Sequence, residues 1–211
     1  RNGGRFFGDG RFHHPDGKAR MLPIRYRAPA SAPCAAFPFR LNTGRIRDQW
    51  HTMTRTARAP RLAAHLAEPF LEIHPRDAHR LGIAPADLVR LENPQGKAIL
   101  RARITDAVAP GDVFAPMHWT GETAPSARID ALVAAHTDPV SGQPESKAST
   151  TAVARFDAAW YGYAVSATEI TPTADYWARA CTRAGWRAEL AAAAQPEDWE
   201  AEARALFGLP V

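Results

Sequence analysis

Lysine, cysteine and long apolar runs are scarce in this 211-residue chain. Only three of its 26 basic residues are lysines, so arginine supplies nearly all of the positive charge. No run of 18 or more apolar residues occurs, so we expect no membrane-spanning helix. The two cysteines, Cys34 and Cys181, lie far apart, and no Cys-x-x-Cys pair exists. This spacing argues against a zinc ribbon or an iron–sulfur cluster held by this chain.

The chain also lacks the signatures of a self-contained catalytic centre. We find no Ser/His/Asp triad order, no His-Glu-x-x-His and no Walker-type loop, and therefore expect no catalytic residue and no metal ligand set. Two scattered cysteines fit a reducing cytosol. The chain begins Arg1-Asn2-Gly3, without Met or an apolar leader, so we interpret it as a piece of a longer polypeptide.

What is present is an ordinary globular composition with an excess of positive charge. The hydrophobic fraction is 45% and the charged fraction 23%, which allows a buried core. The net charge of +4 is compatible with an anionic partner. Nucleic acid is disfavoured, because no aromatic residues alternate with the basic ones to form a stacking surface.

The pattern of turns and apolar stretches divides the chain into three parts. Residues 1–30 contain two Asp-Gly turns and predict a hairpin or lead-in segment at the end of a preceding domain. Residues 31–157 predict a β-rich body with short strands and brief helices, typical of a small barrel or sandwich. The expected strands cover 37–41, 70–74, 88–92, 97–105, 113–117 and 152–156, and a short helix covers 75–81.

Residues 158–211 predict a helical C-terminal extension. One helix is expected to begin at Asp175, after Thr171-Pro172-Thr173, and to end at Gly185. A second is expected to begin after Pro196, where acidic residues favour a helix N-terminus, and to end at Gly208.

The most informative stretch runs from Leu41 to Thr56. A strand enters a Thr43-Gly44 turn that is expected to expose backbone N–H groups and to lead into a short helix. Four arginines and several threonine hydroxyls follow within 15 residues. Guanidinium groups, hydroxyls and amide N–H groups are what a pyrophosphate requires. From the residues alone, a solvated basic loop remains the alternative interpretation.

The same stretch, Asn-Thr-Gly-Arg-x-x-x-Gln-Trp-His-Thr-Met-Thr-Arg-Thr, resembles the opening of a known domain. This is the C-terminal dinucleotide-binding domain of the bis-molybdopterin guanine dinucleotide enzymes, which include nitrate reductases and formate dehydrogenases. Further matches lie at 74–78, 111–119 and 128–132. The run Asp-Pro-Val-Ser-Gly-Gln-Pro-Glu-Ser-Lys at 138–147 and the segments after Trp160 are most similar to the assimilatory nitrate reductases.

The resemblance implies a mainly β fold with short helices, a six-stranded double-psi β-barrel. It also implies a cofactor-binding role for twelve residues. Three would hold a pyrophosphate, namely Thr43, Gly44 and Arg45. Four would line the pterin and phosphates, namely Trp50, His51, Thr52 and Arg55. Five would close the other side, namely His118, Trp119, Asp130, Gln143 and Lys147. The family usually has Gly where Ala86 stands and Asn where Asp130 stands, and an ionised Asp130 cannot donate a hydrogen bond.

The function that the resemblance implies is binding of bis-molybdopterin guanine dinucleotide within a cytoplasmic, assimilatory nitrate reductase. The molybdenum ligand and the iron–sulfur cluster would lie outside this chain. The implied partners are the other domains of the same catalytic subunit and an electron-donor protein or domain, with neither nucleic acid nor a membrane. The alternatives are the same domain of a formate dehydrogenase or periplasmic nitrate reductase, and a free-standing double-psi barrel that serves as a binding module.

Overall fold

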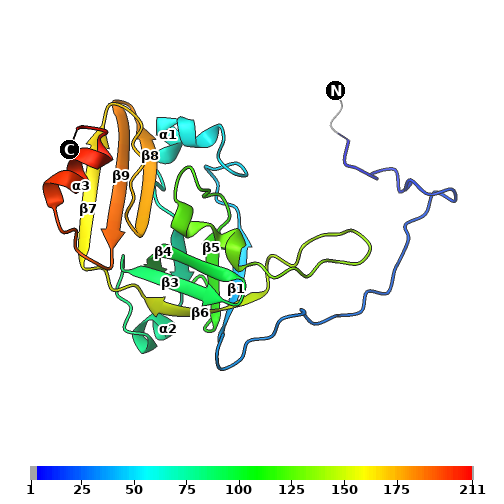
Figure 1. Cartoon of the computed structure of the whole chain (residues 1–211). Helices are drawn as coiled ribbons and strands as arrows, with labels where there is room; N and C mark the ends of the chain where they lie inside the picture. The colour runs from blue at the N-terminus through cyan, green and yellow to red at the C-terminus, as the bar shows by residue number, and fades with distance from the viewer. Residues whose placement is uncertain (1–3, 211) are drawn as a thin grey trace.

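Six strands from the middle of the chain close into a barrel (Figure 1). The computed structural model describes residues 4–210. The strands lie within three residues of the expected ranges, because alternating apolar positions and Pro/Gly turns mark their ends. They are β1 (Phe39–Gly44), β2 (Phe70–Ile73), β3 (Leu88–Asn93), β4 (Gly96–Ile104), β5 (Asp112–Pro116) and β6 (Ser149–Arg155).

The pairing of these strands has an internal two-fold pattern. The order around the barrel is β1-β5-β2-β4-β3-β6, closed by pairing of β6 with β1. Exchanging β1 with β4, β2 with β5 and β3 with β6 reproduces the same set of neighbouring strands. The exchange maps the parallel pair β1–β5 onto the parallel pair β4–β2, and the antiparallel pair β3–β4 onto β6–β1. This is the expected double-psi β-barrel, and the fold-class prediction is confirmed.

The barrel interior is filled by aliphatic side chains that alternate along the strands. The largest fully buried examples include Leu41 on β1, Leu71 on β2 and Leu100 on β4. Burying each such side chain stabilises the fold by roughly 1.5–3 kcal/mol relative to leaving it exposed. The barrel is therefore rigid enough to hold its connecting loops in place.

Only short helical segments connect the strands. The helix α2 (Pro75–Arg80) begins as expected, with Pro75 at its first position and the His74 ring accepting a hydrogen bond from Arg76 N at 3.1 Å. His74 thus flanks and caps the helix. The others are α1 (Pro60–Ala63) and the 3-10 turns η1 (Thr56–Arg58), η2 (Pro125–Ala127) and η3 (Ile129–Leu132).

The C-terminal extension is a small antiparallel sheet with one helix. The prediction of a helix from Asp175 to Gly185 is therefore wrong. In its place the structure has β7 (Trp160–Ser166), β8 (Tyr176–Thr182) and β9 (Gly185–Ala192), in the order β7-β9-β8. The second helix is confirmed as α3 (Trp199–Leu206), which Asp198 caps through the backbone N–H groups of Glu200 and Ala201.

The reason for this error lies in the burial of β8. It packs against the barrel on one face and against the rest of the extension on the other, so all residues from Tyr176 to Cys181 are buried. A strand buried on both faces does not alternate in polarity and cannot be distinguished from a helix by periodicity. Gly185 serves a hairpin turn, where its φ is +139° and a Cβ would lie 2.1 Å from Ser166 O.

A partly buried polar cluster joins the extension to the barrel. Glu68 accepts hydrogen bonds from Arg101 of β4, at 2.7 Å, and from the Tyr176 hydroxyl of β8, at 2.8 Å. Burial, reinforced by the negative charge of Glu68, raises the pKa of Tyr176 well above its usual value. Tyr176 therefore stays protonated and continues to donate to Glu68.

The hairpin expected near the N-terminus is not observed in the described part of that segment. Residues 4–38 form turns and extended chain without a strand, and they run away from the barrel (Figure 1). Residues 1–3 of the expected lead-in lie outside the described residues. The Asp-Gly turns form, but apolar side chains such as Met21 and Ile24 remain more than 90% exposed and have no sheet to pack on. Among residues 4–210, no helix is long and apolar enough to cross a bilayer.

Candidate functional site

The end of β1 and the segment before β6 are tied together by two side-chain hydrogen bonds. Thr43 is buried, and its hydroxyl donates to Ser146 O at 2.7 Å. The Lys147 ammonium donates to Thr43 O at 2.5 Å. Two of the predicted site residues that lie 104 positions apart are therefore in direct contact, which places a cation beside the Thr43-Gly44 turn.

Gly44 is required by a close approach of an aromatic ring. A Cβ at this position would lie 2.6 Å from Cε2 of Phe114 on the neighbouring parallel strand β5. The Gly44 carbonyl accepts a hydrogen bond from Met117 N at 2.9 Å, which continues the strand pairing past the end of β5. Gly44 thus lets the chain leave the barrel close to β5.

Residues 45–55, here called the anion loop, leave β1 without forming the expected helix. The loop turns through left-handed backbone conformations at His51 and Met53, with φ of +43° and +60°. Within residues 51–55 of this segment, all of them described, the backbone N–H groups of four exposed residues donate to no other group of the chain, namely His51, Thr52, Thr54 and Arg55. Left-handed turns that orient free N–H groups outward are typical of anion-binding backbone segments. The amide donors expected from a helix N-terminus come instead from these turns.

His118 holds the anion loop in this shape. Its side chain is fully buried, Nε2 accepts from Ile46 N at 2.9 Å, and Nδ1 lies 2.6 Å from His51 O. Because Nε2 must accept from an amide, Nδ1 carries the proton and donates to His51 O. Burial lowers the pKa of His118, so the ring is neutral. Both ring nitrogens are used within the chain, so His118 positions the loop and has no nitrogen left for a ligand.

Arginine and aromatic groups form the exposed face of the loop. The Arg45 guanidinium lies 5.0 Å from the centre of the Trp50 ring, and the His51 ring meets Trp50 edge-on at 4.6 Å. Trp50 is 61% exposed, which is unusual for so large an apolar group. An exposed aromatic ring next to guanidinium and amide donors can bind a ligand that has both a flat ring and phosphates.

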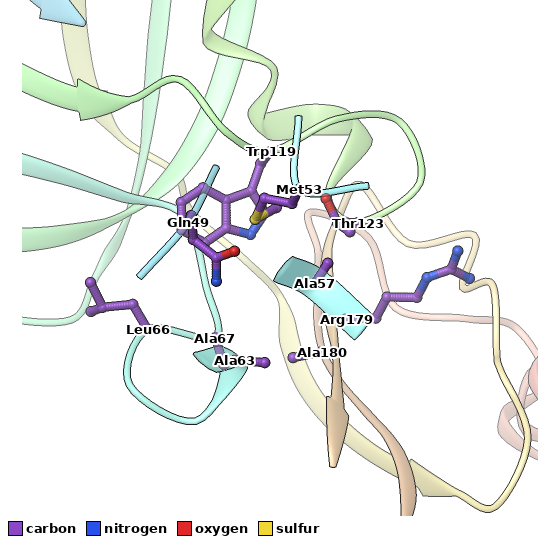
Figure 2. Close-up of a pocket in the computed structure, with 10 residues that line it drawn as sticks. All are labelled: Gln49, Met53, Ala57, Ala63, Leu66, Ala67, Trp119, Thr123, Arg179 and Ala180. Atoms are coloured by element: carbon purple, nitrogen blue, oxygen red, sulfur yellow. The ribbon is translucent and has the colours of Figure 1, made fainter. Parts of the chain in front are cut away.

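Trp119 lies under the loop rather than on it. It is 5% exposed and lines a narrow pocket together with Gln49, Met53 and Arg179 (Figure 2). Trp119 is therefore a packing residue that supports the loop from below, in the same way as Met53. Gln49, which we did not single out from the sequence, has a buried Oε1 without a hydrogen-bond partner among the described residues.

Two further predicted residues lie on separate segments. Gln143 is exposed in the loop 136–147, where its carbonyl accepts from Asp138 N at 2.9 Å and stabilises a turn. Asp130 is exposed on η3, and its carboxylate makes no hydrogen bond with any described residue. The structure thus joins Lys147 to Thr43 beside Gly44 and groups Arg45, Trp50 and His51 on the loop that follows β1, with Thr52 and Arg55 further along the same loop. It gives no contact that joins Asp130 or Gln143 to them.

An ion pair that was not predicted from the sequence ties the loop to the segment after α1. Asp48 lies 2.8 Å from Nδ1 of His65 and 3.0 Å from Nε of Arg47. Hydrogen bonds from Arg47 and then His65 hold the pKa of Asp48 below its usual value. The adjacent Arg47-Asp48 pair was visible in the sequence, but the contact with His65 spans 17 residues and follows only from the fold. No cluster of three or more His, Cys, Asp or Glu side chains able to hold a metal occurs within residues 4–210.

These features define a class, a closed β-barrel whose first loop presents amide and guanidinium donors to an anion. Comparison with known proteins identifies the family. Residues 39–150, just over half of the chain, match the family described as "Molydopterin dinucleotide binding domain", and the chain belongs to it. The cofactor of this family, a molybdopterin dinucleotide, fits the loop, because its diphosphate needs the free N–H groups and cations found there.

The chain is similar to parts of several longer enzymes. It is 40% identical over 190 residues to a nitrate reductase of Klebsiella oxytoca, covering 90% of this chain and 22% of that protein. It is 33% identical to the assimilatory nitrate reductase catalytic subunit of Bacillus subtilis, and the match covers 67% of this chain and 19% of that protein. It is 39% identical to the F420-dependent formate dehydrogenase subunit alpha of Methanocaldococcus jannaschii, and the match covers 52% of this chain and 16% of that protein. Among solved structures, acetylene hydratase from Pelobacter acetylenicus aligns with a TM-score of 0.48 at 18% identity, covering 57% of this chain and 18% of that one. The chain thus spans about a fifth of these curated relatives.

Proposed function

We propose that this chain holds bis-molybdopterin guanine dinucleotide as one domain of a molybdenum-dependent nitrate reductase that converts nitrate to nitrite for assimilation. The observation that carries the proposal is the anion loop, with its four free N–H groups, which follows β1 and the Thr43–Lys147 contact in the chain. The similarity to two nitrate reductases supports the choice of substrate.

Each group in the loop has a distinct role in this proposal. The N–H groups of His51, Thr52, Thr54 and Arg55 bind phosphate oxygens, and Arg45, Arg55 and Lys147 supply the opposing positive charge. Trp50 offers its exposed face to a ring of the cofactor. His118 and Trp119 hold the loop from below. The bound cofactor supplies the oxygen-transfer chemistry, and this chain supplies its position and electrostatic environment.

The proposal is tested by removing one cation from the loop in the full-length enzyme. Arg45→Ala is expected to weaken cofactor retention by roughly tenfold, because a charge-assisted contact to phosphate is lost. The molybdenum and guanine nucleotide content of the purified protein is the measurement. Arg76→Ala serves as the control, because Arg76 is exposed on α2 and forms no ion pair within residues 4–210. Wild-type molybdenum content in Arg45→Ala would remove Arg45 from the site.

A second candidate is the corresponding domain of a formate dehydrogenase. It is supported by the 39% identity to the F420-dependent formate dehydrogenase subunit. A periplasmic nitrate reductase is a third member of the same class. Nitrate and formate turnover by the intact enzyme distinguish these candidates, and formate oxidation without nitrate reduction would replace the proposed substrate.

The proposed context is the cytoplasm, where the barrel completes a catalytic subunit whose other domains carry the molybdenum ligand and the iron–sulfur cluster. An electron-donor protein or domain would reduce that subunit. The contrasting proposal, a free-standing binding module, predicts that the chain alone forms the entire mature protein. Mass spectrometry of the protein isolated from its native cell separates the two, because a subunit roughly four to five times as long is expected from the 22% and 19% coverage of the relatives.

A further inference from the structure

A second cationic cavity lies beside the anion loop and shares no residue with it. This cavity, here called the arginine groove, is formed where α1 packs against the β8–β9 hairpin (Figure 1). Its volume is about 420 Å³. Its lining comprises Pro60, Arg61, Ala63, Ala64, His65, Cys181, Thr182, Arg183 and Arg187.

The charge of the arginine groove is of one sign. Arg61 comes from α1, Arg183 from the hairpin turn and Arg187 from β9, and His65 follows α1. No carboxylate is among the lining residues. Within residues 4–210, none of the three arginines forms an ion pair or a side-chain hydrogen bond, whereas eight other arginines of the chain are paired with carboxylates. The fold therefore gathers three guanidinium groups without a direct ion pair from segments about 120 residues apart, and a longer-range attraction acts between Arg187 and Glu189.

This arrangement matches a specific class of ligand. Guanidinium groups are planar forks that bind phosphate or carboxylate through two parallel hydrogen bonds. Three of them around one cavity repel one another, and a multivalent anion offsets that repulsion. The volume lies in the range that accommodates small-molecule ligands, and the Thr182 hydroxyl adds a polar group to the wall.

We propose that the arginine groove is a binding site for a phosphoryl group, separate from the cofactor-binding loop. The groove and the loop are linked by one contact, because His65 of the groove lies 2.8 Å from Asp48 at the base of the loop. The phosphoryl group could be supplied by free inorganic phosphate or pyrophosphate, or by a nucleotide. The two sources share the same recognition chemistry and differ in whether a base adds affinity.

The test uses the full-length, cofactor-loaded protein, so that the anion loop is already filled. Isothermal titration calorimetry with pyrophosphate measures the dissociation constant of the wild type, Arg183→Ser/Arg187→Ser, and the control Arg76→Ser. The double variant is expected to bind at least about tenfold more weakly, because two charge-assisted contacts are removed. The control is expected to bind like the wild type. Equal affinity in the double variant, or no saturable binding by the wild type, overturns the proposal.

Two further arms locate the anion and its source. The molybdenum and guanine nucleotide content of the wild type, measured before and after titration, is expected to stay constant, because pyrophosphate binds in the groove and not in the filled loop. Release of the cofactor by pyrophosphate together with full binding in Arg183→Ser/Arg187→Ser places the anion in the loop and overturns the groove. Replacing pyrophosphate with ADP distinguishes the sources, because tighter ADP binding that is also lost in the groove variant assigns the site to a nucleotide. Circular dichroism at 25 °C verifies that each variant is folded before titration.

Discussion

The barrel wall and the anion loop differ in how their backbone groups are satisfied. In the wall, each strand pairs with two neighbours, and side chains such as Leu41, Leu71 and Leu100 are fully buried. In the loop, four N–H groups are free, two non-glycine residues have positive φ, and Trp50 and Arg45 face outward. Stability is therefore concentrated in the strands, and binding capacity in a segment of which only Met53 belongs to the buried hydrophobic core.

The contact between the two regions is narrow. One buried imidazole, His118, joins Ile46 and His51 of the loop to the barrel, and Lys147 joins the end of β1 to the segment before β6. Such an arrangement predicts that substitutions in the barrel wall change the free energy of unfolding and that substitutions on the outer face of the loop change cofactor binding. Substitution of His118 should change both.

The largest effect is expected in the wall. Leu100→Ala removes a fully buried side chain from the centre of β4 and leaves a cavity, so the free energy of unfolding should fall by about 2–5 kcal/mol. Urea denaturation monitored by tryptophan fluorescence measures this change. Arg55→Ala in the loop should leave the unfolding midpoint equal to that of the wild type within experimental error. A loss of stability from Arg55→Ala as large as that from Leu100→Ala would contradict the distinction between the barrel wall and the loop.

The next largest effect is expected at His118, which connects the loop to the barrel. His118→Leu leaves the Ile46 N–H and the His51 carbonyl without their buried partner, which should lower the free energy of unfolding by about 1–3 kcal/mol. It should also reduce cofactor retention, because the left-handed turn at His51 loses its support. Unfolding midpoint and molybdenum content are measured together, with His79→Leu on the exposed side of α2 as the control. A drop in stability with unchanged molybdenum content would show that the loop does not need this support.

The same histidine predicts a pH dependence. The folded-state pKa of His118 lies below the unfolded value of 6.5, so the unfolded chain binds the proton more readily. Stability from the neutral ring is therefore fully present above pH 6.5 and is lost as the pH falls through the folded pKa. Thermal midpoints measured from pH 8 to 5 should decline more steeply in the wild type than in His118→Leu. Parallel curves for the two proteins would contradict a neutral, buried His118.

The smallest effect is expected at Ala86, which lies before β3. Its φ is +68°, a left-handed conformation that favours glycine. Ala86→Gly should raise the free energy of unfolding by up to about 1 kcal/mol, because the Cβ strain is relieved at the cost of some chain entropy. A higher midpoint in urea is the expected result, and a lower midpoint would mean that the strain is negligible.

The barrel could be predicted from the sequence strand by strand, whereas most of the extension could not. The barrel strands have one face toward the core, so their polarity alternates, and turns such as Asn93-Pro94-Gln95-Gly96 mark their ends. The strand β8 is buried on both faces and follows Thr171-Pro172-Thr173, which imitates a helix start. Its strand state is set by pairing with β9 and by packing on the barrel, neither of which is local.

The residues of the candidate site that lie in one sequence motif could be predicted, whereas the roles that depend on contacts between distant parts of the chain could not. Arg45, Trp50 and the N–H groups from His51 to Arg55 lie within one contiguous run of sequence. The supporting role of His118 depends on a contact 67 residues away, and the arginine groove depends on contacts spanning about 120 residues. Trp119 and His118 were assigned to the ligand from their motif, and only their burial reveals that they support the loop from within.

The most direct test of the central claim is amide hydrogen exchange in the loop. Protein loaded with cofactor is compared with protein from which the cofactor has been removed, and exchange is followed in peptides covering residues 51–55 and, as a reference, β4. The account predicts that amides 51–55 exchange rapidly without cofactor and become strongly protected when it is bound, with β4 protected in both states. Rapid exchange of these amides in fully loaded protein would contradict the assignment of the anion loop to the cofactor.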